Sequence, residues 1–203
     1  MLINTHGDKD AITANAAIRD FFDCYTLPDA IQVLERIISA SCRSKAWKGK
    51  SPFHVLFFTE HLQHLFAAAA VLQQRYAQNK KGILPLPREL HHIQPQHYCN
   101  HAAKGNNWHW FPRHLGRKKY CNPYMVLQQF TKLYPVHKSS RLAATLAEYA
   151  LSNYAIDEEY NSLWVLQARC RLLQLIEACH LILVRTQDTA INKKPKHNHH
   201  ASP

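Results

Sequence analysis

The sequence predicts an all-α protein, a single-domain bundle of five or six helices with one long, basic and His-rich connection at about 79–121. Three observations favour this fold class. The chain has 203 residues, of which 46% are hydrophobic, so it can bury a core of its own. Glycine is rare, with only 5 residues, which argues against a turn-rich fold. Apolar residues also recur at spacings of three and four over most of the chain outside the connection.

The first half of the chain predicts three helices. The first covers about 10–25, where apolar residues repeat on one side. The second begins at Pro28, since proline is favoured in the first turn of a helix. The third begins after Ser51, an expected N-cap that is followed by Pro52, and its apolar pattern continues to about residue 78.

The second half of the chain predicts three more helices and a tail. Asn122 is expected to cap the first of them, and the next covers about 138–152. The last, at about 157–185, is apolar around most of its circumference, which is typical of a helix in the middle of a bundle. The folded domain is therefore expected to cover 1–190, and the basic, His-rich segment 191–203 to be a disordered tail.

Positive charge is concentrated in the middle of the chain. The net charge is +11, yet 17 Lys/Arg and two acidic residues lie between Arg36 and Ala147, and no Asp or Glu occurs from Leu90 onward in that stretch. The rest of the chain holds 8 Lys/Arg and 12 acidic residues. This asymmetry predicts a positive face that binds an anionic partner, with nucleic acid first and a phosphorylated ligand or an acidic protein second. Solubility alone is the alternative explanation.

Lys and Arg also cluster before two of the expected helix starts. The N-terminus of a helix presents unpaired N–H groups and a partial positive charge, which together bind phosphate or carboxylate. Ordinary capping beside solvated lysines is the alternative interpretation. The candidate anion-binding residues are Lys48 and Lys50 before the third helix, and Arg113, Arg117, Lys118, Lys119 and Asn122 before the fourth.

Two tryptophans of the connection, Trp108 and Trp110, allow two interpretations. Beside arginines, such side chains can stack on the bases of a single-stranded nucleic acid. They can also fix the connection against the bundle, and this anchoring role is favoured because Trp side chains fill gaps in protein cores.

A cluster of histidines and cysteines in the connection is a candidate zinc site. His97, Cys99 and His101 alternate, so an extended chain would direct all three to one side. With Cys121 they supply the four nitrogen and sulfur ligands that zinc prefers. The spacing matches no known zinc motif, since CxxC and HExxH are both absent from the sequence. No cofactor is therefore predicted, although zinc stays open.

Three polar residues interrupt the last predicted helix near one side: Arg169, Glu177 and His180. If they are buried, each needs a partner, because an unpaired buried charge is costly. Glu177 and His180 have the Glu-x-x-His spacing of di-metal helix bundles, in which two such motifs and two further Glu residues meet. Acidic residues in the core appear too few for that site, so a core Glu–His pair is the favoured interpretation.

The sequence contains no Gly-rich phosphate loop and no GxSxG motif. We therefore expect a non-catalytic binding protein, and catalysis stays open. The alternatives are a metal-binding bundle protein or enzyme that uses the His/Cys-rich connection or the Glu177–His180 pair, and a ligand-free structural protein, including a homo-oligomer. The start lacks an apolar signal core and the cysteines do not form a small secreted framework, so we expect a cytoplasmic protein without a membrane span.

Overall fold

The computed structural model describes residues 5–43, 47–49, 51–78 and 110–191, and all regular elements in these ranges are helical. This confirms the predicted all-α class. The elements are α1 (Thr5–Cys24), α2 (Leu27–Ser41), α3 (Pro52–Gln78), α4 (Arg117–Cys121), α5 (Tyr124–Leu133), α6 (Val136–Leu151), the short 3-10 helix η4 (Ile156–Glu158) and α7 (Ser162–Ile191). The five-residue α4 is not among the predicted helices, because it lies inside the predicted connection. The predicted tail and most of that connection lie outside the described residues.

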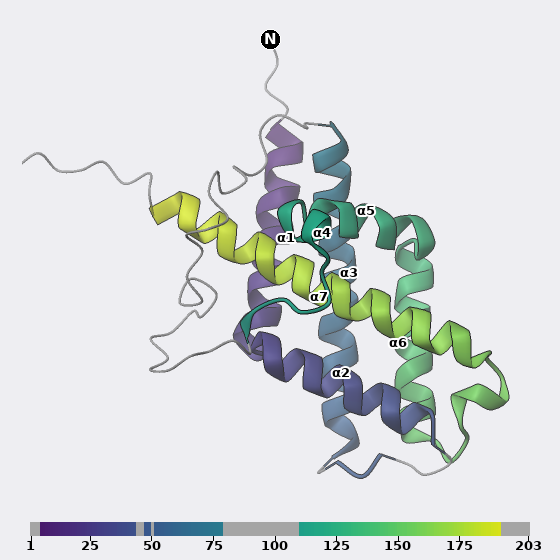
Figure 1. Cartoon of the computed structure of the whole chain (residues 1–203). Helices are drawn as coiled ribbons and strands as arrows, with labels where there is room; N and C mark the ends of the chain where they lie inside the picture. The colour runs from purple at the N-terminus through teal and green to yellow at the C-terminus, as the bar shows by residue number, and fades with distance from the viewer. Residues whose placement is uncertain (1–4, 44–46, 50, 79–109, 192–203) are drawn as a thin grey trace, which may run out of the picture.

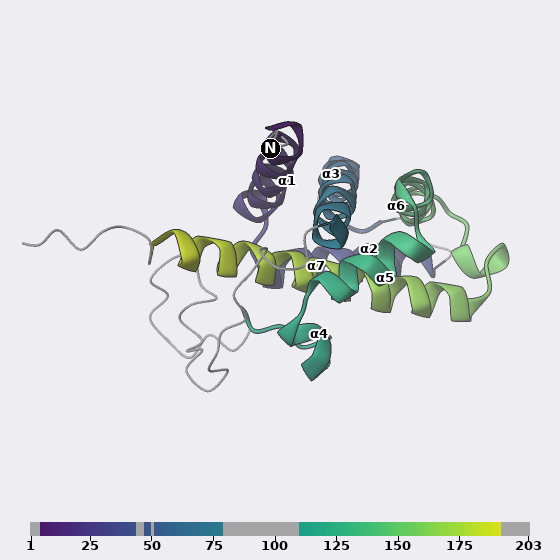
Figure 2. The ribbon, with the colours of Figure 1, turned by 90° about the horizontal axis from the view of Figure 1, so that it is seen from above.

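The helices form two layers (Figures 1 and 2). In the first layer α1, α3 and α6 lie side by side, and α3 is in the middle, in contact with both neighbours. In the second layer α2, α5 and α7 cover one face of the first, and α7 contacts α1, α2 and α5. Because α4 lies on the outer side of α7, the last helix is enclosed between α4 and the first layer.

An apolar core fills the space between the two layers. Its largest fully buried side chains include Phe21 of α1, Phe58 and Phe66 of α3, and Phe130 of α5. Burying one such side chain stabilises a fold by roughly 1.5–3 kcal/mol relative to leaving it exposed. The helices that supply these rings are therefore the ones that position the rest of the molecule.

The last helix is enclosed along its second half only. Between Leu172 and Arg185 nearly all side chains of α7 are buried, as its apolar circumference predicts. In its first half, Leu163 and Leu166 are 58% and 60% exposed. The difference arises because residues 110–116 and α4 cover the outer side of the second half and leave the first half open.

The two predicted helix starts differ in the structure. Ser51 caps α3 as predicted, since its hydroxyl accepts the backbone N–H of Phe53 at 3.2 Å. The prediction for Asn122 is wrong, because Pro123 occupies the N-cap position of α5 and no side chain caps that helix. The Asn122 amide instead donates to the Tyr76 hydroxyl at 2.8 Å. The Asn122 side chain therefore makes a tertiary hydrogen bond instead of capping the helix that follows it.

Among the described helices, α3 is the one that is long and apolar enough, by length and composition, to cross a membrane. Half of its most apolar segment is buried inside the bundle, where α3 contacts α1, α5 and α6. Such burial is usual for the central helix of a bundle. The expectation that the chain has no membrane span stays a prediction.

Candidate functional site

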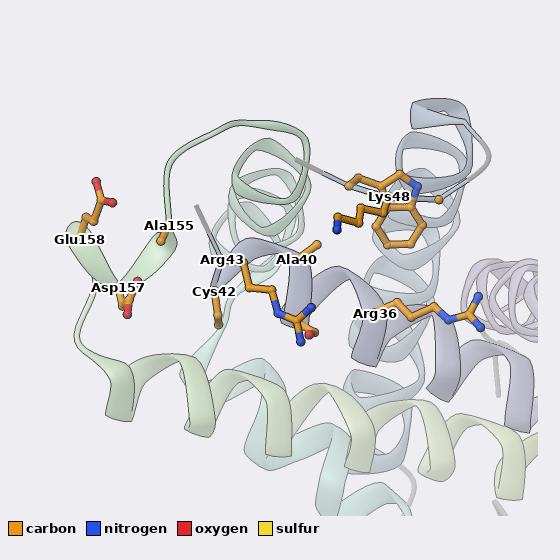
Figure 3. Close-up of a pocket in the computed structure, with 11 residues that line it drawn as sticks. Arg36, Ala40, Cys42, Arg43, Lys48, Ala155, Asp157 and Glu158 are labelled. Carbon is orange, nitrogen blue, oxygen red and sulfur yellow. The ribbon is translucent and has the colours of Figure 1, made fainter. Parts of the chain in front are cut away.

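A cavity of about 1000 Å³ lies where the C-terminal half of α2 faces residues 47–49 and η4 (Figure 3). Several charged side chains line it, and they come from segments far apart in the sequence. The cationic residues are Arg36 of α2, and Arg43 and Lys48, which lie between α2 and α3. The acidic residues are Asp157 and Glu158 of η4.

The packing of α2 decides which of its residues reach the cavity. Leu34 and Ile38 lie on its buried side, with 1% and 5% of their surfaces exposed. Arg36 and Arg43 are both exposed. Arg36 lies within the helix, whereas Arg43 directly follows its C-cap residue, Cys42. The second half of α2 and the residues that follow it thus bring both arginines to the lining of the cavity.

Trp47 forms another part of the wall. Its backbone N–H donates to the carbonyl oxygen of Ala150 at 2.9 Å, which ties the segment to the end of α6. The indole is half-buried against the main core. Gly49 approaches the indole so closely that a Cβ at this position would lie 1.9 Å from Nε1 of Trp47. The packing of Trp47, and with it the shape of the cavity, therefore requires glycine at position 49.

The charges of the cavity are separated in space. Figure 3 shows Asp157 and Glu158 at one side, Arg36 and Lys48 at the other, and Arg43 between them. All five residues are exposed. Within the part of the chain that the structure describes, no carboxylate forms an ion pair with any of the three cations. A ligand would therefore meet uncompensated positive charge on one side of the cavity and negative charge on the other.

The cavity also contains a thiol, that of Cys42. Partial burial of this thiol raises its pKa above the ordinary value, and the negative charge of Asp157 raises it further. A hydrogen bond with Ser41 acts in the opposite direction, with an effect on the pKa that is smaller than that of burial but larger than that of Asp157. Cys42 is therefore a neutral thiol at neutral pH, and a neutral thiol is a poor nucleophile. The arrangement suits binding better than covalent catalysis.

A second group of cations lies on residues 110–121, which we call the basic platform. Glu177 of α7, which is fully buried, holds this segment in place. Its carboxylate accepts the backbone N–H groups of Arg113 at 2.7 Å and His114 at 2.8 Å. Nδ1 of His114 lies 2.7 Å from Oε1 of the same carboxylate. Three hydrogen bonds thus satisfy a charge that would be costly to bury alone.

Arg185 of α7 holds the other end of the platform. Its guanidinium donates to the carbonyl oxygens of Tyr120 at 2.7 Å and Cys121 at 3.3 Å. It also lies over the ring of Tyr120, 5.2 Å from the centroid. The last carbonyl groups of a helix have no partner within the helix, and a cation there is favourable. Arg185 therefore completes the end of α4.

The predicted anion-binding residues of the platform divide into two kinds. Arg117 and Lys118 are exposed, and in the described part of the chain neither has a carboxylate partner. Lys119 is half-buried and donates to the side chain of Gln174 at 2.7 Å. Burial lowers the pKa of Lys119, and the nearby charge of Arg171 lowers it further. Lys119 therefore helps to attach α4 to α7.

The two predicted anion sites lie at opposite ends of α3. Lys48 lies at the cavity just before the first turn of this helix, whereas Asn122 binds Tyr76 in its last turn. The 27 residues of α3 span about 40 Å. Lys50, the other candidate near the cavity, is outside the described residues. The cations thus form at least two separate groups, one at the cavity and one on the platform.

Trp110 has the anchoring role that the sequence favours. It is half-buried and packs on Leu181 and Val184 of α7, together with other side chains of the platform. Base stacking by Trp110 stays a prediction, with much of its surface already in contact with α7. Trp108, the other candidate for stacking, lies outside the described residues.

The predicted zinc site cannot be built from the described residues, since His97, Cys99 and His101 fall outside them. Cys121, the fourth candidate ligand, is half-buried at the end of α4. Among the residues that the structure describes, no group of three or more His, Cys, Asp or Glu side chains is arranged to hold a metal ion.

The three polar residues of the last helix do not form one cluster. Arg169 makes a two-pronged ion pair with Glu35 of α2, and the two side chains are 40% and 32% exposed. Glu177 binds the platform rather than His180, so the predicted core Glu–His pair is wrong. The partner of Glu177 is His114, and no local sequence pattern identifies it.

His180 faces an aromatic ring instead of an acid. It is 4% exposed, and its ring packs edge-on against Phe22 of α1, with centroids 5.0 Å apart. Within the described structure its Nδ1 is buried without a hydrogen-bond partner. Burial lowers the pKa of His180 to about 4, so the side chain is neutral at neutral pH.

Several residues of the cavity are missing from the sequence prediction, namely Arg36, Arg43, Asp157 and Glu158. The helical period could have placed Arg36 on the polar side of α2, whereas no local pattern brings the other three residues to the cavity. No protein-family model matches the sequence, and no curated protein or solved structure is detectably similar to it.

Proposed function

We propose that the protein is a non-catalytic binding protein and that its cavity at the end of α2 receives a phosphorylated small molecule. The observation that supports this most directly is the approach of Arg36, Arg43 and Lys48 to one cavity, with no ion-pair partner among the described carboxylates. Guanidinium groups bind phosphate through paired, charge-assisted hydrogen bonds. A volume of about 1000 Å³ is in the range of small-molecule sites.

The two acidic residues of the cavity, which form its acidic wall, restrict the kind of ligand that can bind. Asp157 and Glu158 repel a second anionic group but accept hydrogen bonds from hydroxyl or amino groups. The ligand that fits both walls carries phosphate at one end and hydroxyl or amino groups at the other. Sugar phosphates and nucleoside monophosphates have this chemistry, and the half-buried Trp47 offers them an apolar surface.

Calorimetric titration tests this proposal. Nucleoside monophosphates and hexose phosphates are titrated into the protein beside their unphosphorylated forms, and only the phosphorylated compounds should bind. In the variant Arg36→Gln/Arg43→Gln the affinity should fall about a hundredfold or more, since each charged hydrogen bond contributes about 1.5–3 kcal/mol. The matched control is Arg19→Gln/Arg141→Gln, which removes two exposed arginines away from the cavity. Equal binding by the two double variants contradicts the proposal.

The basic platform supports a second candidate function, contact with the phosphate backbone of a nucleic acid. Arg117 and Lys118 are exposed on a segment that the buried residues Glu177 and Arg185 hold in place. The segment also belongs to the long part of the chain without acidic residues. Fixed cations lose little conformational entropy when they bind, which favours contact with a regular array of phosphates.

Oligonucleotide binding at several salt concentrations tests this second candidate. Each phosphate contact contributes about −0.9 to the slope of log affinity against log salt on duplex DNA, so Arg117→Glu/Lys118→Glu should reduce the slope by about 2. The control Lys132→Glu/Arg141→Glu makes the same change in charge on exposed residues of α5 and α6. If the control has the same effect, binding follows net charge and the platform has no special part in it.

A further inference from the structure

A cysteine and a histidine from different helices meet where α1 ends against α3. Cys24 is the last residue of α1, and His61 lies in the middle of α3. The distance between Sγ of Cys24 and Nε2 of His61 is 3.6 Å, which is a hydrogen-bond distance for sulfur. Because α1 and α3 pack along each other, the fold itself sets this pairing.

The hydrogen bonds of His61 fix which of its nitrogens carries the proton. Nδ1 of His61 lies 2.9 Å from the carbonyl oxygen of Phe57, one turn earlier on α3. A carbonyl oxygen only accepts, so Nδ1 must donate its hydrogen there. In the neutral ring Nε2 then has no hydrogen, and its lone pair faces the thiol of Cys24. The imidazole is therefore oriented as a base toward the sulfur.

Aromatic neighbours keep the His61 ring in this orientation. The ring of Phe57 lies 4.1 Å from it between centroids, and the ring of Tyr25 lies 6.2 Å away at 81°. Cys24 itself is exposed, so dissolved reagents can reach its sulfur. A nucleophile, a base within hydrogen-bond reach and a third group that orients the base are the three parts of an activated thiol.

The other described cysteines lack this arrangement. The sulfur of Cys170 accepts a hydrogen bond from Gln174 at 3.5 Å, and an amide cannot remove a proton. Burial raises the pKa of the Cys42 thiol and the charge of Asp157 raises it further, while burial also raises the pKa of Cys179. Among the cysteines of the described ranges, Cys24 is thus the one whose partner is an imidazole nitrogen.

We propose that Cys24 is a nucleophilic thiol, with His61 as its base, and that it exchanges with low-molecular-weight disulfides. The thiol proton moves to Nε2 of His61, and the thiolate attacks one sulfur of the disulfide. As the new S–S bond forms, the old one breaks, and the departing thiolate takes the proton from His61. Cys24 is oxidised to a mixed disulfide while half of the reagent is reduced to a thiol. This modification site is independent of the proposed anion binding.

The local electrostatics make His61 essential to the proposal. Cys24 is the last residue of α1, so it lacks the helix N-terminus that activates many reactive cysteines. Asp20 and Asp23, exposed on the same helix, add negative charge nearby in the sequence. Without a base, Cys24 should therefore react no faster than an ordinary exposed thiol.

The uncharged disulfide 4,4′-dithiodipyridine is a suitable probe, because the basic surface of the protein does not attract it. The folded protein is treated at pH 7 for short times, and mass spectrometry measures the modification of each cysteine. We expect Cys24 to react faster than Cys42 and Cys170 by about a hundredfold or more, the lower end of what a base contributes. Equal rates at these three exposed cysteines overturn the proposal.

Two further measurements identify the cause of the difference. His61→Gln should slow Cys24 to the rate of Cys170, whereas His137→Gln, which changes an exposed histidine on α6, should leave Cys24 unchanged. In the wild-type protein unfolded in urea, the rates of Cys24 and Cys170 should become nearly equal, a result that needs no variant to fold. An advantage of Cys24 that survives His61→Gln or unfolding contradicts the role of His61.

Discussion

Glu177 and Arg185 lie inside the bundle on α7, whereas Arg36 and Arg43 lie on its surface beside the cavity of α2. Each of the two buried residues binds backbone groups of the basic platform. The two exposed arginines have no carboxylate partner within the described chain. Burying a charge is costly unless the fold pairs it, while an exposed charge is left for solvent or a ligand.

The comparison shows how the charged residues of this protein can be divided by their burial and their partners. The hydrogen bonds of Glu177 connect α7 to the platform and are part of the fold itself. The cations of the cavity are exposed, so under the proposed function they pair with a ligand rather than with the fold. Stability measurements should therefore separate the two groups, with large effects for buried charges and small ones for exposed charges.

The largest effect is expected for Glu177→Ala. The change removes the acceptor for two backbone N–H groups and leaves His114 without its acid, all in a buried position. Breaking a buried charged network costs about 4 kcal/mol, so the free energy of unfolding in urea should fall by that amount. Glu60→Ala on the exposed side of α3 is the control and should change it little. If both variants lose similar amounts of stability, burial does not distinguish the charges that hold the fold together from those that do not.

The next largest effect concerns His180 and the pH. Its pKa is lowered to about 4 by burial, while the unfolded chain has a value near 6.5. Between these two values the unfolded state binds more protons than the folded state, so stability rises with pH over this window and is lost as the pH falls from 6.5 toward 4. The loss amounts to about 3 kcal/mol at most.

Urea unfolding at several pH values measures this dependence. In His180→Leu the part of the slope that belongs to this residue should disappear, whereas His137→Gln, an exposed control on α6, should keep it. If the free energy of unfolding of His180→Leu depends on pH as steeply as that of the wild-type protein, other groups cause the acid sensitivity.

Local patterns in the sequence predicted the fold class and several helices, because capping and periodicity act over a few residues. The start of α3 at Ser51 and Pro52 is one example. Asn122 has the same local pattern but binds Tyr76, 46 residues away, so the capping rule fails there. The short α4 has no apolar period of its own, and a distant residue, Arg185, binds its last carbonyl groups.

The candidate sites were less predictable, since they depend on contacts between distant segments. The sequence indicates that Glu177 needs a partner if buried, but its nearest candidate, His180, is not that partner. The actual one, His114, lies 63 residues away. In the cavity, Lys48 could be predicted from local charge, whereas the acidic wall of Asp157 and Glu158 reaches it only through the packing of the bundle.

A smaller effect is expected in the wall of the cavity, for Gly49→Ala. The added Cβ would meet the indole of Trp47 at 1.9 Å, so the ring or the backbone must move. Overpacking of this kind costs about 2 kcal/mol, which unfolding in urea measures. Gly116→Ala is the matched control, because a Cβ there meets nothing within 4 Å. If Gly49→Ala is as mild as the control, the indole does not depend on glycine for its position.

The smallest effect is expected for the ion pair of Glu35 and Arg169, which connects α2 to α7 in two-pronged geometry. Both side chains are about one-third exposed or more, at 32% and 40%, so water screens their attraction. A double-mutant cycle with Glu35→Gln and Arg169→Gln should give a coupling energy of about 0.5 kcal/mol, and 1 M salt should remove most of it. A coupling energy of about 2 kcal/mol that persists in 1 M salt would mean that this surface pair stabilises the fold in the way that the buried Glu177 does. In that case solvent exposure would not decide which charges hold the bundle together, and the exposure of Arg36 and Arg43 would no longer indicate that they are left for a ligand.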